Sequence, residues 1–390
     1  MHLLKNYVQQ LKRLLAATLM LLWLLGGSSL SCSDAHAHAD ASVVAVTTGE
    51  ARTVTDLAGR QVEITTPARS LVGIHSALSL VCYMQLASQV VGVEHEEKDP
   101  RQWVGSTGRS YRMANPHLGT LPSIGSRRQI DAEALVALQP DVIFMGWGSA
   151  QVADHLQQQT GIPVLIVHNG NLTTQRHLFE QSLDLIATVC DRHERAAQIK
   201  EFIHSSLADL RQRSSVSPAP TTVYIGGLNF RVAHGLLGTS RAYPPFVLLQ
   251  ANNIADAIMP PANLVKGRFS IAVENLLKAD PEVIFICASG ETLVRDDLHH
   301  PAFAALRAVR DKRLYRIIPH YYAASPDTVL AETYYIGSIL YPEAFADVVI
   351  AATADRFYRF FVGQPLYTQM AALFGPFAQI NTEDVDTPAL

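Results

Sequence analysis

Short apolar runs rich in β-branched residues recur along the chain and are separated by segments with helical periodicity. The runs lie at residues 71–74, 90–93, 142–145, 164–167, 222–225, 283–287 and 314–318. Loops after the first four carry Gly, Ser and His. Short buried strands that alternate with helices are typical of parallel α/β layers. The pattern therefore predicts an α/β fold with two blocks of strands.

A stretch without any strand signal separates the two blocks. Apolar residues recur at helical spacing from Ala197 to Leu210, and a helix of about 22 residues here would reach roughly 33 Å. We expect Asp191 to cap its start, with Glu194 as the capping-box partner. The sequence SSVSPAP at 214–220 ends it. One long helix is therefore predicted to join two lobes as a stiff connection.

An internal repeat relates the two halves of the chain. Residues 133–144 read EALVALQPDVIF, and residues 274–285 read ENLLKADPEVIF. Each copy predicts a short helix that runs into a buried strand, with Glu, Pro and VIF in the same register. Because one copy falls in each proposed lobe, we interpret the lobes as structurally equivalent halves.

The first 31 residues differ from the rest of the chain. Three basic residues, Lys5, Lys12 and Arg13, precede an apolar run at 14–25, which at about 12 residues is too short to span a bilayer and suits an export signal. Two alternative processing sites fit the end of this signal. One is lipoprotein processing at Cys32, and the other is ordinary signal cleavage at the A-x-A match that ends in Ala37. Residues 1–31 are therefore predicted to be an export signal and 32–52 a tether. We expect the mature protein in the periplasm or on the outer face of the cytoplasmic membrane, soluble or lipid-anchored through Cys32.

Charge, cysteines and motifs exclude several other classes of protein. The chain has 31 basic and 35 acidic residues, which leaves no basic excess to neutralise a nucleic-acid backbone. Cys82, Cys190 and Cys287 lie in apolar settings without metal or redox spacing, and we expect buried free thiols. No G-x-S-x-G, H-E-x-x-H or P-loop pattern occurs in the sequence, so an envelope enzyme is a minor alternative.

Several motifs in a fixed order resemble one known family. They are TVTDLAGRQVEI, LVGIHSALSLV, VVGVEH, LPSIGS, the repeated helix-Pro-strand unit, VYIGGLNF, AYPPFVLL and AETYYIGSILYPEAFAD. Together they make residues 53–361 similar to the periplasmic solute-binding proteins of ABC importers for iron-siderophore complexes, haem and vitamin B12.

The resemblance implies a fold and a role. It implies a class III binding protein, in which two Rossmann-like α/β lobes are joined by a single long helix. The expected parts are an N-terminal lobe at 53–172, a helical segment at 173–214, a C-terminal lobe at 215–355 and a C-terminal segment at 356–390. It also implies a monomer without enzymatic activity that docks on a membrane permease and its ATPase. In this family a surface glutamate of each lobe contacts permease arginines, and Glu133 and Glu274 stand at those positions. A sensor that kept the fold and lost transport is a further alternative.

Ligands of open α/β lobes bind beyond the carboxyl ends of the strands. This rule selects the loops after the predicted strands, where glycines allow close backbone approach and aromatic rings can stack on a flat ligand. Two further candidates are Arg112, in an irregular segment at 95–120 expected outside the core, and Tyr243 at a rim position. The candidate ligand-binding residues are His75, Ser76, Arg112, Trp147, Asn229, Arg231, Tyr243, His320, Tyr321 and Tyr322.

The ligand itself is less defined than the role. We see no compact His/Asp/Glu set that could bind a bare metal ion, so we predict no metal site and no resident cofactor. As the ligand, a metal already bound by a chelator is preferred to a bare ion. A ferric siderophore is the first expectation. Haem, a corrinoid, and an oxyanion such as molybdate or tungstate stay open, because glycine loops at helix starts also bind anions.

Overall fold

The computed structural model describes residues 49–99, 108–215, 221–230, 234–258, 267–320 and 325–380. The predicted export signal, most of the predicted tether and Cys32 lie outside the described residues. The same holds for Arg231, Tyr321 and Tyr322. In the described part, no helix combines the length and the apolar character needed to cross a membrane.

The first lobe is built on a parallel four-stranded sheet in the order β4-β3-β7-β8. The antiparallel hairpin β1-β2 precedes the sheet in the chain. A second, very short hairpin, β5-β6, lies between β4 and β7 in the chain. The hairpin strand β1 begins at Glu50, so residues 50–52 belong to the lobe and not to the predicted tether. The strands are β1 (Glu50–Thr55), β2 (Gln61–Thr66), β3 (Leu71–Ile74), β4 (Val90–Gly92), β5 (Gly125–Ser126), β6 (Gln129–Ile130), β7 (Val142–Met145) and β8 (Val164–Ile166), and the helices are α2 (Ala77–Tyr83), α3 (His95–Lys98), α5 (Ser110–Ala114), α6 (Ala132–Leu138) and α7 (Ala150–Thr160).

The second lobe contains a five-stranded sheet in the order β11-β9-β13-β14-β15. Its first four strands are parallel, and β15 pairs antiparallel with β14. The strands of this lobe are β9 (Thr222–Gly226), β10 (Gly238–Ser240), β11 (Asn252–Asn253), β12 (Arg268–Ser270), β13 (Val283–Cys287), β14 (Leu314–Ile317) and β15 (Ala378–Gln379), and the helices are α10 (Pro244–Leu248), α11 (Val273–Ala279), α12 (Glu291–Leu298), α13 (Pro301–Ala304) and α14 (Arg307–Arg310).

All seven predicted strands are present within one residue of their expected bounds. All but β14 are buried along most of their length, as expected for parallel strands covered on both faces, and β14 is buried at its two end residues. Cys82, Cys190 and Cys287 are buried free thiols, as predicted. Two lobes that each carry a mainly parallel sheet confirm the predicted α/β fold class.

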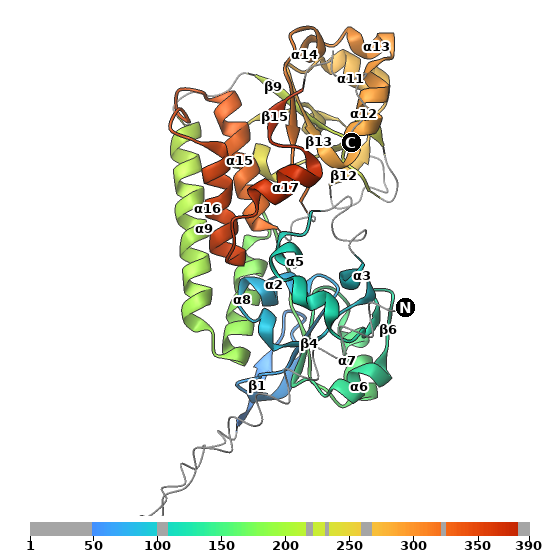
Figure 1. Ribbon diagram of the computed structural model, residues 1–390, viewed down its shortest axis with the longest axis vertical. Helices are drawn as coiled ribbons and strands as arrows, with labels where there is room; N and C mark the ends of the chain where they lie inside the picture. Colours follow the sequence, from blue (N-terminus) through green and yellow to red (C-terminus); the bar gives the residue numbers. More distant parts are fainter. Residues whose placement is uncertain are drawn as a thin grey trace, which may run out of the picture. The chain divides into compact units, whose positions relative to one another are not determined.

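A further layer of helices accompanies the two sheets. It consists of α8 (Arg176–Cys190), α9 (His193–Ser214), α15 (Pro326–Leu340), α16 (Ile350–Val362) and α17 (Tyr367–Phe374). Helix α9 has 22 residues and packs on α8, α10 and α15, and Figure 1 shows it beside α15 and α16. The expected boundary at residue 355 falls inside α16, and β15 completes the second sheet. The second lobe therefore extends beyond its predicted end.

The predicted start of the long helix is wrong in one detail. Asp191 adopts a left-handed conformation with φ of 55° and ends α8, where its N–H bonds to the carbonyl of Ala187. Helix α9 begins after Arg192, which provides no capping side chain. Glu194 accepts a hydrogen bond from Gln198 one turn further on. The capping-box prediction fails because Asp191 serves as the C-cap of the preceding helix.

The internal repeat corresponds to two equivalent structural units. Helices α6 and α11 each have seven residues and place Glu133 and Glu274 at their second position. Each ends at a residue in the left-handed conformation, Gln139 or Asp280, followed by Pro and a buried strand. Both glutamates are exposed. This equivalence supports the interpretation of the lobes as related halves.

Candidate ligand site

His75 follows β3 directly and sits at the carboxyl end of the first sheet. Its φ of 60° turns the chain, and its backbone N–H donates to Glu94 Oε1 over 2.7 Å. Its Nδ1 donates to the carbonyl of Trp147 over 2.8 Å, and the two rings stack with centroids 3.9 Å apart. Burial lowers the pKa of His75. The stack holds the Trp147 ring in place while 49% of Trp147 remains exposed.

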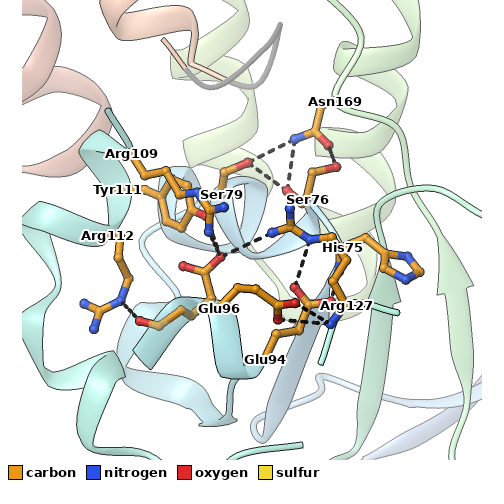
Figure 2. Close-up of polar contacts among 11 residues, drawn as sticks. His75, Ser76, Ser79, Glu94, Glu96, Arg109, Tyr111, Arg112, Arg127 and Asn169 are labelled. Carbon is orange, nitrogen blue, oxygen red and sulfur yellow. Dashed lines mark hydrogen bonds and ion pairs between the residues drawn. The ribbon is translucent and has the colours of Figure 1, made fainter. Parts of the chain in front are cut away.

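Ser76 links the start of α2 to the loop after β8. Its hydroxyl bonds to Asn169 Oδ1, and Asn169 Nδ2 donates to Ser76 O at 3.2 Å and to Ser79 Oγ at 3.0 Å. Figure 2 shows this polar group beside the charged residues of the same lobe. Asn169 was not among the predicted residues, although the strand-end rule applied to the run at 164–167 leads to its loop.

The backbone N–H groups in the first turn of α2 have no side-chain cap, and we call this helix start its open amide end. Ser76 is its N-cap, yet no described side chain caps the helix. Gly146, which follows β7, approaches this turn so closely that a Cβ there would lie 2.6 Å from Ala77 N and 2.6 Å from Ser76 Oγ. Uncapped N–H groups at a helix start carry partial positive charge and attract anions. Because residue 146 is glycine, the backbone after β7 can pack closely against this helix start.

A buried charge cluster supports this edge of the sheet. Glu97 accepts from Arg109 Nη1 at 2.5 Å and from the Tyr111 hydroxyl at 3.0 Å, and Arg127 Nη2 lies 3.9 Å from the same oxygen. Arg127 Nε also lies 3.6 Å from Glu94 Oε2. Figure 2 shows Arg109, Tyr111, Arg127 and Glu94 in this cluster. Burial raises the pKa of Glu94 to about 7 despite the nearby arginine.

Arg112 belongs to the packing of this lobe. It is buried, and its guanidinium donates to the carbonyls of Glu97 and Asn115 over 2.8 and 2.6 Å. Burial lowers the pKa of Arg112. Because Tyr111 and Arg112 are both buried, the expectation that the segment at 95–120 lies outside the core is wrong for them. Their contacts give them a structural role, and a ligand contact of Arg112 stays a prediction.

The second lobe places Asn229 at the end of β9. Asn229 Nδ2 donates to the carbonyl of Ser289 over 2.8 Å, and Arg268 Nη1 donates to the backbone oxygen of Asn229 over 3.2 Å. The carbonyl of Ser289 can only accept, which fixes the orientation of the amide. Asn229 Oδ1 is buried and meets no donor among the described residues. Asn229 therefore offers an acceptor.

Tyr243 and His320 converge on Glu332, a residue of α15. The Tyr243 hydroxyl donates to Glu332 Oε1 over 2.6 Å, and His320 Nδ1 lies 3.2 Å from Glu332 Oε2. Tyr243 is buried, so it does not occupy the predicted open rim. Sequence reasoning missed Glu332, although a lone acid in the apolar stretch LAETYYIGSIL is a signal for a buried polar role.

The predicted site residues therefore form two groups. His75, Ser76 and Trp147 lie together in the first lobe, while Tyr243 and His320 share a carboxylate in the second. No cluster of three or more His, Cys, Asp or Glu side chains suited to a metal ion occurs among the described residues. Together with the Asn229 Oδ1 acceptor, the two groups offer hydrogen-bond donors and an aromatic face, which suits noncovalent capture of a small molecule.

These features define a two-lobed α/β binding protein whose lobes each present a strand-end polar group. A family model described as periplasmic binding protein matches residues 85–321, which is more than half of the chain. The chain belongs to this family. It is therefore the periplasmic substrate-binding component of an ABC transporter, working with a membrane permease and its ATPase, and is not an enzyme.

Known proteins of the same kind resemble the chain over most of its length. The molybdate-binding protein MolA of Haemophilus influenzae is 24% identical over 336 residues, covering 80% of this chain and 90% of MolA. The structure of MolA bound to molybdate aligns with a TM-score of 0.60 at 21% identity, covering 80% of this chain and 98% of MolA. A periplasmic solute-binding protein of Veillonella parvula aligns at 0.64 and 17% identity, covering 87% and 99%. CeuE of Helicobacter pylori with Ni(II) bound aligns at 0.57 and 20% identity, covering 80% and 96%. These structural likenesses show the fold.

Proposed function

We propose that this chain captures a tetrahedral oxyanion of the molybdate or tungstate type and delivers it to its permease. The observation that carries the proposal is the open amide end of α2 beside Gly146. A helix start with unsatisfied N–H groups is a ready anion site. The similarity to a protein named for binding molybdate supports the same ligand class. We therefore prefer the oxyanion to the ferric siderophore that the sequence motifs favour.

A metal chelate is the second candidate. Trp147 keeps about half of its surface exposed while stacked on His75, and such a ring can cover a flat chelate. Asn229 Oδ1 is an acceptor without a donor among the described residues, which a fully deprotonated oxyanion cannot satisfy. A ferric siderophore, haem or a corrinoid would use both groups.

Docking follows from the repeat. Glu133 and Glu274 are exposed in the first turns of equivalent helices, where the helix dipole favours a carboxylate. Bidentate pairing with arginine fixes orientation as well as adding attraction. We therefore assign the two glutamates to permease contact. Attachment of the mature chain to the membrane through a lipid on Cys32 remains part of the proposal.

Calorimetric titration of the purified protein tests the ligand. Molybdate and tungstate should bind, while a ferric hydroxamate chelate and haemin should give no heat. Gly146→Val should abolish oxyanion binding because its Cβ would lie 2.6 Å from Ala77 N and would displace the start of α2. Gly161→Val is the matched control, since Gly161 has a φ of 71° and a Cβ there would meet nothing within 4 Å, so the substitution strains the backbone without contacting α2. Binding of the ferric chelate alone would overturn the oxyanion assignment.

A further inference from the structure

A groove of about 580 Å³ lies between α9 and α16 in the layer of helices. Figure 1 shows these two helices beside α15. None of the described candidate ligand residues lines this groove, so it is separate from the site at the strand ends. Small-molecule sites in proteins have volumes of about 300–1,000 Å³. The groove is therefore large enough to hold a small molecule.

The groove exists because α9 and α16 are joined at both ends and held apart between them. At one end the Phe202 ring stacks on the Phe360 ring with centroids 3.7 Å apart. At the other end Arg213 forms a bidentate pair with Asp347, just before α16, at 2.5 and 2.9 Å. The side chains that line the groove between these ends include four small ones, Ser205, Ser206, Ala352 and Thr353. Small side chains leave space that the two end contacts keep open.

Arg356 brings a positive charge to the groove. Its guanidinium carbon lies 4.8 Å from the centroid of the Phe357 ring and 5.7 Å from that of the Tyr334 ring. No carboxylate of a described residue forms an ion pair with it. A guanidinium stacked over aromatic rings keeps its N–H groups directed outward in its own plane. Because Arg356 is exposed, these donors are accessible to an anion that enters the groove.

The two aspartates of the groove already have partners. Asp209 accepts from the Tyr334 hydroxyl and from Arg213 Nε, the latter at 2.9 Å. Asp347 uses both carboxylate oxygens in its pair with Arg213. Further negative charge placed beside these carboxylates is repelled in proportion to its size. A ligand carboxylate, with a single charge and a fork that matches a guanidinium, therefore suits the groove better than a doubly charged phosphate.

The remainder of the groove suits an apolar group. Val349 lines it and is 68% exposed, and it stands two helical turns from Arg356, which is about 10 Å. Ser205 and Ser206 donate their hydroxyl protons to the carbonyl of Phe202, within their own helix. These hydroxyls therefore offer no further proton to a ligand. An apolar body that extends from Arg356 toward Val349 would remove apolar surface from water.

We propose that the groove between α9 and α16 is a second ligand site that binds a small carboxylate with an apolar body. The carboxylate accepts two hydrogen bonds from Arg356, and the apolar body covers Val349 and lies along Ala352. The inference does not depend on which ligand the strand-end site captures. Because the bound molecule contacts α9 and α16 together, it stabilises the folded chain in proportion to its occupancy.

Calorimetric titration of the purified protein with octanoate and with naphthoate tests the site. At least one of these carboxylates should bind at millimolar concentration, whereas octylamine, with the opposite charge, and acetate, without an apolar body, should not. Arg356→Gln should lower the affinity by about tenfold or more, because hydrogen bonds between charged groups are lost. Arg359→Gln is the matched control, since Arg359 lies on the same helix, pairs with Asp355 at 3.8 Å and does not line the groove.

A second pair of variants tests the space without changing a charge. Ala352→Trp should fill the groove and abolish carboxylate binding, while Ala351→Trp, at an exposed neighbour that does not line the groove, should bind as the wild type does. Octanoate should raise the thermal midpoint of wild type and Ala351→Trp but not of Ala352→Trp.

Three outcomes would show the proposal to be wrong. They are no binding of either carboxylate, wild-type affinity in Arg356→Gln, and competition between octanoate and molybdate, which would move octanoate to the strand-end site. If the protein binds no molybdate or tungstate, the proposed oxyanion function fails, but the carboxylate titrations still decide whether the groove is a ligand site.

Discussion

Replacing Glu94 by glutamine should change the pH dependence of stability. Glu94 is almost fully buried, and burial raises its pKa from 4.5 to about 7 even though Arg127 Nε lies 3.6 Å away and the N–H of His75 bonds to it. Below about pH 4.5 the carboxyl is neutral in the folded and unfolded chains, so burial of charge costs nothing there. Between these two pKa values the unfolded chain ionises first, and the folded state loses relative stability as pH rises.

The size of this effect follows from the shift. A shift from 4.5 to about 7 corresponds to about 3 kcal/mol, which the folded state loses in full above pH 7. Glutamine stays neutral at every pH and avoids this loss. Its amide group faces Arg127 and costs about 1–3 kcal/mol if it finds no acceptor, but that cost is the same at all pH values. The free energy of unfolding of Glu94→Gln, taken relative to wild type, should therefore be about 3 kcal/mol higher at pH 8 than at pH 4.

Urea denaturation of wild type and Glu94→Gln at pH 4, 6 and 8 measures this difference. The matched control is Glu63→Gln, because Glu63 is exposed on β2 and its variant should show a difference near zero. The raised pKa of Asp327 acts equally on wild type and variant and cancels. A difference near zero, or a variant that loses stability as pH rises, would refute the reasoning and show that Arg127 outweighs burial.

Three further predictions concern docking, helix caps and lobe movement. Alanine at both Glu133 and Glu274 should lower transport at least tenfold in vesicles with the permease, with ligand affinity by calorimetry unchanged. Asp131→Ala removes the side-chain bond to Ala134 N of 3.0 Å and should cost about 1 kcal/mol in urea denaturation, whereas Ala272→Asp adds a cap to α11, which has none, and should gain a similar amount. X-ray scattering profiles with and without ligand should be nearly identical, and a large compaction would contradict the stiff connection.

The fold could be predicted where local pattern decides it. Apolar runs such as those of β3 and β13 became strands because they are buried on both faces of a parallel sheet. Strand β15 could not be predicted, since it has two residues and exists only through its pairing with β14. The error at Asp191 has a similar origin. An Asp near a helix start also suits the left-handed end of the helix before it, and tertiary structure selects between them.

The candidate site was predictable where the rule of strand ends applies. That rule led to His75, Ser76, Trp147 and Asn229, whose loops follow strands in the structure. It did not lead to Arg127 or Glu332, because one lies in a short hairpin and the other in the middle of a helix. Their contacts span 30 or more residues or join separate elements, so no local pattern in one sequence reveals them.

The two lobes combine a symmetric exterior with different interiors. Glu133 and Glu274 occupy equivalent places because the repeat sets helix length, left-handed end and strand in the same register. The residues at the strand ends do not repeat. The first lobe has an uncapped helix start with a buried cluster that includes Arg109 and Arg127, and the second has the carboxylate of Glu332 between a tyrosine and a histidine. Docking on a permease needs two matched contacts, but recognition of one small ligand needs complementary groups on its two sides. The repeat therefore accounts for the proposed docking surface, and we expect ligand specificity to come from the residues that depart from the repeat.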